Sequence, residues 1–135
     1  MHRISIGFLI LLLAAATAAT QADSLVGTLE LDRGRPVLKT AAGALVRLEG
    51  DAATQAVLAD VRLHGRRLEL VGKAVAADRF EVGPIHLKSM YVIDGGRRLL
   101  ISYWCDVCAI RTYTPGKCQC CQEETALELR AADKP

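Results

Sequence analysis

Aromatic side chains are scarce in this sequence, which has one tryptophan, three tyrosines and two phenylalanines among 135 residues. The stretch that we expect to form a β-barrel, residues 23–88, holds only Phe80, and Tyr91 follows just beyond it. Barrels that bind single-stranded nucleic acid stack the bases on aromatic side chains. The shortage of aromatic residues therefore argues against nucleic acid as a partner.

Neither sign of charge dominates the chain, since 17 basic residues stand against 15 acidic ones and the formal net charge is +2. Such a balance gives no electrostatic reason to bind nucleic acid or an anionic membrane. After residue 22 there is also no apolar run of the about 20 residues that a membrane span needs. We expect no membrane span in the mature chain, and the sequence names no particular protein or small-molecule partner.

The residue groupings of common hydrolytic enzymes are missing as well. Besides His2, the histidines are His64 and His86, and neither belongs to a recognisable serine–histidine–aspartate arrangement. An isolated histidine has no ligand set around it, so we expect both to be structural or on the surface. Glu123 and Glu124 are adjacent, so their carboxylates would point in different directions. We therefore predict that the protein is not an enzyme and has no catalytic residues.

Residues 1–22 have the features of a secretory signal peptide. A short positive start precedes the apolar run 4–16, and small residues lead to a predicted cleavage after Ala22. Cleavage after Ala19 is one alternative, and an uncleaved anchor helix is another. The apolar run is shorter than the about 20 residues that span a bilayer, which favours cleavage. We therefore predict an exported protein, periplasmic or secreted.

Residues 23–88 alternate apolar and polar side chains in the manner of β-strands. Three strands separated by glycine-containing turns are expected over residues 24–48. A fourth strand is expected over residues 67–71, ending near the Gly72-Lys73 step. A fifth begins at residue 79, breaks at Gly83-Pro84 and is extended through residues 85–88.

A short helix is expected over residues 52–60, because Asp51 is a favourable N-cap and no glycine or proline interrupts the segment. Val57, Leu58 and Val61 have the spacing of its buried face. Three strands, a helix and two strands is the order of the OB-fold, whose closed barrel leaves few exposed edges. In its glycine-turn meander and in the helix before the Gly-Lys strand end, the segment resembles small exported OB-fold domains.

Residues 89–135 are predicted to form a β-hairpin that carries a cysteine-rich knuckle. The strands 90–93 and 97–103 flank an Asp-Gly-Gly turn, and residues 125–130 form a closing strand. Alternate apolar residues of the second strand share one face: Leu99, Ile101 and Tyr103. The predicted fold class is thus mainly β, with an OB-fold-like five-stranded barrel, one short helix and a C-terminal hairpin and zinc-knuckle module.

All five cysteines lie in this C-terminal segment, and four of them form two Cys-x-x-Cys pairs. The pairs are Cys105/Cys108 and Cys118/Cys121, separated by residues 109–117. Each pair can form a tight turn that aims two sulfurs at one point, and two such turns give a tetrahedral four-thiolate site. Zinc suits that geometry, and iron is an alternative. We predict these four cysteines as the metal ligands, with Zn²⁺ as the expected ion.

Two other interpretations of the cysteines stay open. Disulfides are favoured by the oxidising environment of exported proteins, although an odd number of cysteines leaves one unpaired. Thiol redox chemistry needs a thiolate of low pKa, usually at a helix N-terminus, and neither pair precedes a clear helix. We expect Cys120, between two predicted ligands, to point away from the site, and Tyr103 and Trp104 to pack over it.

Residues 103–127 resemble the short heavy-metal-binding module of copper-exporting P-type ATPases and metal-efflux proteins. The residues that match the module are Tyr103, Cys105, Pro115-Gly116-Lys117-Cys118 and Cys121. Cys108 stands where the module has a histidine, and the module's methionines are missing. The resemblance implies a metal knuckle, with copper as a further candidate ion and heavy-metal handling or sensing as an alternative function.

Overall fold

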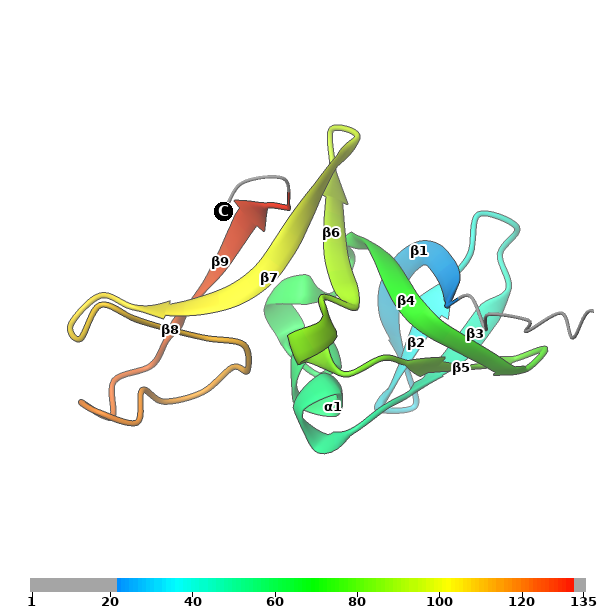
Figure 1. Cartoon of the computed structure of the whole chain (residues 1–135). Coiled ribbons are helices and arrows are strands. Elements are labelled where there is room, and N and C mark those ends of the chain that lie inside the picture. Colours follow the sequence, from blue (N-terminus) through cyan, green and yellow to red (C-terminus); the bar gives the residue numbers. More distant parts are fainter. Residues whose placement is uncertain (1–21, 133–135) are drawn as a thin grey trace, which may run out of the picture.

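The structure, a computed structural model, describes residues 22–132, and within them the chain is mainly β (Figure 1). The strands are β1 Asp23–Asp32, β2 Arg35–Lys39, β3 Leu45–Glu49, β4 Arg67–Ala76, β5 Arg79–Val82, β6 Met90–Asp94, β7 Arg97–Cys105, β8 Ile110–Thr112 and β9 Ala126–Ala131. The helices are α1 Ala52–Leu58 and the short 3₁₀ helices η1 Val61–Leu63 and η2 Ile85–Leu87. In this range no helix has the length and apolar character of a membrane span. The predicted signal peptide lies outside the described residues, apart from its last residue.

The first five strands close into a barrel in the order β1-β2-β3-β5-β4, because β4 pairs back with β1. Every pairing around the ring is antiparallel except that of β3 with β5, which is parallel. Closure satisfies the backbone groups at both edges of each strand. The predicted OB-fold-like five-stranded barrel with one short helix is confirmed.

The helix α1 begins where the sequence predicts, because Asp51 Oδ1 accepts a hydrogen bond of 2.8 Å from the Thr54 backbone N–H. Val57 and Leu58 are fully buried, as expected. Val61 is wrong as a core residue, since 74% of it is exposed. The helix ends at Leu58 and η1 starts at Val61, so the helical phase on which that prediction depended is broken.

Two strand boundaries also differ from the prediction. Residues 85–88 do not extend β5, because Ile85–Leu87 form the 3₁₀ turn η2 and Lys88 ends it, and Pro84 removes a backbone donor at the start. Strand β4 continues past Gly72 to Ala76, because β5 pairs with this second half. A Cβ at Gly72 would lie 2.0 Å from the carbonyl oxygen of Glu81, so only glycine allows the two strands to approach this closely.

The remaining strands grow from the side of the barrel. Strand β6 pairs with the first half of β4, β6 and β7 form the predicted hairpin, and β7 then pairs with β8 on one edge and β9 on the other. Figure 1 shows this β8-β7-β9 group extending to one side of the barrel. Cys105 is the last residue of β7, so the central strand of the group leads directly to the first cysteine.

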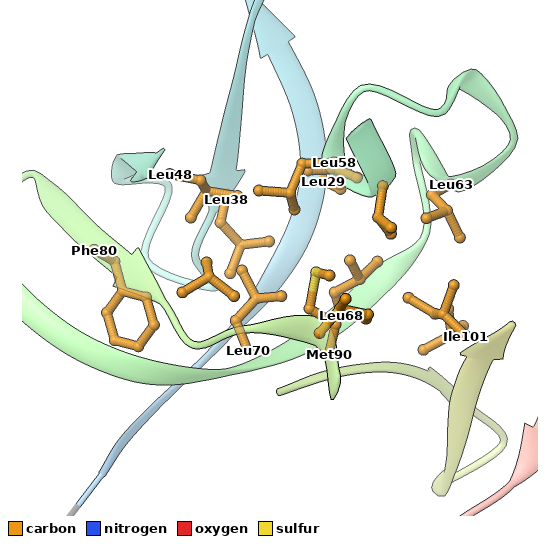
Figure 2. Close-up of a cluster of buried hydrophobic side chains, with 14 of the residues drawn as sticks. Leu29, Leu38, Leu48, Leu58, Leu63, Leu68, Leu70, Phe80, Met90 and Ile101 are labelled. Carbon is orange, nitrogen blue, oxygen red and sulfur yellow. The ribbon is translucent and has the colours of Figure 1, made fainter. Parts of the chain in front are cut away.

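One apolar core runs through the barrel and under β7. Figure 2 shows its main side chains, of which the following are labelled: Leu29, Leu38, Leu48, Leu58, Leu63, Leu68, Leu70, Phe80, Met90 and Ile101. Leu99, Ile101 and Tyr103 belong to the same cluster, which confirms the predicted inner face of β7. A fully buried side chain of this kind contributes roughly 1.5–3 kcal/mol. The strand that carries Cys105 is therefore held by the barrel's own core.

Candidate metal centre

The first cysteine pair forms the turn between β7 and β8. The Cys108 backbone N–H donates to Cys105 Sγ at 3.4 Å, and Ala109 follows with a φ of 53°. The left-handed conformation reverses the chain, so that Ile110 pairs with Cys105 across the hairpin. Two sulfurs are thereby placed on the inside of a tight turn.

The second pair forms a similar turn in the loop between β8 and β9. The Gln122 N–H donates to the Cys118 carbonyl at 2.9 Å, and the Cys118 N–H donates to the Glu123 carbonyl at 2.8 Å. Gln122, directly after the second cysteine, has a φ of 64°, so it repeats the left-handed conformation of Ala109. The loop is closed at its base by Thr125, whose N–H and Oγ1 both donate to the Gly116 carbonyl.

The two turns meet, and the four predicted ligand atoms all lie within 4.8 Å of one another: the Sγ atoms of Cys105, Cys108, Cys118 and Cys121. The Cys105 and Cys121 sulfurs, from different turns, are 3.5 Å apart. Zinc–sulfur bonds of about 2.3 Å in a tetrahedron require sulfur–sulfur distances of about 3.8 Å. No separation needs to shorten by more than about 1 Å to reach this geometry, so the four sulfurs could hold a metal ion after a small closure.

The site has a buried side and an open side. Cys105 and Cys118 are each 1% exposed, whereas Cys108 and Cys121 are partly exposed and Cys120 is exposed. All five, which lie within the described residues, are free thiols. A disulfide needs a sulfur–sulfur distance of about 2.05 Å, well below the 3.5 Å of Cys105 and Cys121.

Hydrogen bonds and burial shift the pKa values of the thiols in opposite directions. The backbone N–H groups of Cys121 and Cys120 point at Cys118 and lower the pKa of its thiol to about 7. At Cys105 the Cys108 N–H acts in the same direction, but burial and the neighbouring thiols outweigh it and raise the pKa. Metals bind the thiolate, so Cys118 is the ligand that is ready at neutral pH.

Cys120 lies outside the four-sulfur set and is exposed, as its place between two predicted ligands leads us to expect. The neighbouring Cys120 thiol and burial together raise the pKa of the Cys108 thiol.

A shallow pocket of about 370 Å³ adjoins the cysteines. Cys105 and Cys121 form part of its wall, and three carboxylate residues, Asp106, Glu123 and Glu124, line it as well. Trp104 borders the pocket too, and Arg111 stacks over its ring at 5.0 Å. The approach to the sulfurs from this pocket is therefore acidic, which favours cations over anions.

A buried polar network ties the cysteine module to the barrel. Asp60, whose side chain is 5% exposed, receives the Tyr103 hydroxyl at 2.9 Å and forms an ion pair with Arg62 at 2.9 Å. Arg62 Nη1 also donates to the Thr125 carbonyl at 3.0 Å. Burial, together with the charge of Asp60, raises the pKa of the Tyr103 hydroxyl. Tyr103 precedes the first cysteine turn and Thr125 follows the second, so the hydrogen bonds of Asp60 and Arg62 at η1 hold both turns against the barrel.

This network was not evident from the sequence. Asp60 and Tyr103 are 43 positions apart and no spacing rule connects them. Tyr103 consequently packs into the barrel core instead of over the sulfurs, while Trp104 does border the site. His64 and His86 lie outside the sulfur cluster, and His64 Nε2 is within 3.2 Å of the Leu58 carbonyl.

Comparison of the chain with protein-family models, curated proteins and solved structures finds no match. The assignment of the site therefore rests on its geometry.

Proposed function

We propose that this protein is an exported, non-enzymatic metal-binding protein, in which Cys105, Cys108, Cys118 and Cys121 hold one zinc ion. The observation that carries the proposal is the convergence of these four sulfurs within 4.8 Å, from two turns of matching shape. Each turn places a backbone N–H on its first sulfur and a left-handed residue after its second cysteine. Both features hold the sulfurs pointing inwards before any ion binds.

The ligand chemistry favours zinc. All four donors are soft thiolates that lie within 4.8 Å of one another, and a set of four thiolates suits Zn²⁺ best and Fe²⁺ or Cu⁺ next. Four protein ligands leave no open coordination position, and an open position is what catalytic zinc sites keep. A mainly structural ion is therefore the consistent role, in agreement with the prediction that the protein is not an enzyme.

The ion would stabilise a segment that has little apolar packing of its own. Residues 113–125 contain no strand or helix, and hydrogen bonds hold the loop, among them the Thr125–Gly116 bonds, those of the Cys118–Glu123 turn and the bridge between Lys117 and Glu124. Binding one ion to sulfurs of both turns would fix this loop to the end of β7. The OB-like barrel would then serve as the binding domain for a protein or small-molecule partner.

The test is metal analysis of protein purified from the periplasm, combined with a count of reactive thiols. We expect one zinc per chain, lost in Cys105→Ser and in Cys118→Ser. Cys120→Ser is the matched control and should keep the ion in the purified protein. Two stable disulfides and no metal would contradict the proposal.

Two alternative functions give different results in the same assay. Exchangeable copper in place of zinc would indicate heavy-metal handling or sensing. A metal-free protein with one readily reduced disulfide would indicate thiol–disulfide exchange, for which the lowered pKa of Cys118 is the supporting observation.

A further inference from the structure

The C-terminal strand β9 has one open edge. In the described part of the chain β9 pairs only with β7, and Figure 1 shows it on the side of β7 that faces away from β6. The Ala132 N–H donates to the Arg98 carbonyl, so the even-numbered residues of β9 are the ones in hydrogen-bonded pairs with β7. The N–H and C=O groups of Leu127, Leu129 and Ala131 therefore point outwards, away from β7.

The open edge has few of the features that protect such strands in other proteins. Protected edges are very short, are bent by a bulge, or carry proline or lysine. Strand β9 has six residues without proline or lysine, and its register with β7 is not shifted. Strand β8, at the opposite edge of β7, has only three residues. The β9 edge, with Glu128 and Arg130 as its two charges, is therefore the one suited to pairing with a further strand.

We propose that β9 pairs antiparallel with β9 of a second copy of this chain, with Leu129 at the two-fold axis. This pairing sets Glu128 of each copy opposite Arg130 of the other, so that symmetry gives two opposite-charge pairs. Both pairs fall at non-hydrogen-bonded positions, where side chains on opposing strands come closest. The charges of the strand are thus complementary to those of its own copy.

The same two charges disfavour the neighbouring registers. Backbone hydrogen bonds form only in registers that pair the outward-facing residues with one another, so the axis moves in steps of one residue. An axis at Glu128 sets this residue opposite its own copy, and an axis at Arg130 does the same for the arginine. Like charges directly opposite each other destabilise a strand pair. The axis at Leu129 is therefore selected, and it sets Leu127 opposite Ala131 of the other copy.

The contacts of Glu128 within its own chain are compatible with this pairing. Arg111 Nη2 lies 2.8 Å from Glu128 Oε2, and the Ser102 hydroxyl donates to the same oxygen at 3.3 Å. A carboxylate has about four acceptor sites on its two oxygens. Oε1 can therefore accept from Arg130 of the second copy while Oε2 keeps its present donors.

Pairing would also cover apolar surface and extend the sheet. Leu127 and Leu129 pack against the core from one side and are only partly buried. In the pair, the two Leu129 side chains lie side by side at the axis, on the same face as the core. The strands would then run β8-β7-β9-β9-β7-β8 across two copies. No cysteine takes part, so the inference goes beyond the proposed zinc site and does not depend on it.

The first test measures the mass of the mature full chain by sedimentation equilibrium, with a reductant that prevents disulfides through the exposed Cys120. We expect a dimer. Ala131→Pro removes an outward N–H that β7 does not use, and edge strands tolerate proline at such positions. This variant should be a monomer with the circular dichroism of the wild type. A monomeric wild type, or a folded Ala131→Pro variant that dimerises as tightly as the wild type, overturns the inference.

The second test reverses the charges. Arg130→Glu sets two glutamates opposite each other at both pairs and should raise the dissociation constant of the dimer about tenfold or more. Adding Glu128→Arg restores opposite charges at both pairs and should recover the dimer. Arg35→Glu is the matched control, because it makes the same charge change at an exposed residue of β2, which does not pair with β9. An Arg130→Glu dimer as tight as the wild type, or no recovery in the double variant, overturns the inference.

Discussion

The buried Asp60 network gives the sharpest prediction about how the barrel supports the cysteine module. Asp60→Ala removes the ion pair with Arg62 and leaves the buried Tyr103 hydroxyl without its acceptor. Breaking a fully buried pair costs 3–5 kcal/mol, but the Arg62 side chain is 39% exposed and can be solvated. We therefore expect a loss of about 2–3 kcal/mol in the free energy of unfolding.

Tyr103→Phe tests the other arm of the network. A hydrogen bond to a charged group contributes about 1.5–3 kcal/mol, and Asp60 keeps its bonds to Arg62, so the cost should be near the lower end. In an Asp60→Ala background the same change should cost almost nothing, since the hydroxyl has then lost its acceptor. The double-mutant cycle should give a coupling energy of about 1.5 kcal/mol.

Urea unfolding of the mature chain at fixed metal content measures these values. Asp78→Ala is the matched control, because Asp78 forms an exposed ion pair with Arg47 at 3.2 Å and should cost no more than about 1 kcal/mol. Arg62 lowers the pKa of Asp60 from its ordinary 3.8 although burial opposes it, so the stabilisation is present above pH 3.8 and is lost as the pH falls further. Equal costs for Asp60→Ala and Asp78→Ala would refute the reasoning.

Four further predictions concern single turns, one close strand contact and the acidic pocket. Ala109→Gly should stabilise the protein by about 0.5–1 kcal/mol in thermal unfolding, because glycine adopts the left-handed conformation of this position without the strain that alanine has there. A loss of stability would contradict this. Gln122→Gly should gain less, because the Gln122 side chain also donates to two carbonyls of its turn. Gly72→Ala should cost at least about 1–3 kcal/mol, measured by denaturant unfolding, because its Cβ would clash with β5. Replacing Glu123 and Glu124 together by glutamine should slow zinc uptake in stopped-flow measurements at low salt, and the difference should fade at high salt. An effect that does not depend on salt would exclude steering by these charges.

The barrel could be predicted from the sequence because its signals are local. Strand alternation, glycine turns and the Asp51 cap each act within a few residues, and together they specify the order of the elements. The errors have two kinds of cause. Val61 is exposed because α1 stops early, which is a local effect that the spacing did not show. Strand β4 runs past Gly72 because β5, later in the chain, pairs with it.

Part of the cysteine site could likewise be predicted from the sequence, and part of it could not. The two Cys-x-x-Cys turns follow from spacing, so the four sulfurs that meet are the ones that the sequence singled out. The support from Asp60 depends on how the barrel places it beside Tyr103, and no spacing that can be recognised along the chain encodes this contact.

The central claim is that two turns built by different strands form one thiolate site, and the most direct measurement is Co²⁺ titration of the reduced mature chain. The account predicts one equivalent of cobalt per chain with a tetrahedral spectrum and four thiolate ligands, displaced by one equivalent of Zn²⁺. Absence of cobalt binding, or a spectrum with only two thiolates from a single Cys-x-x-Cys pair, would contradict it.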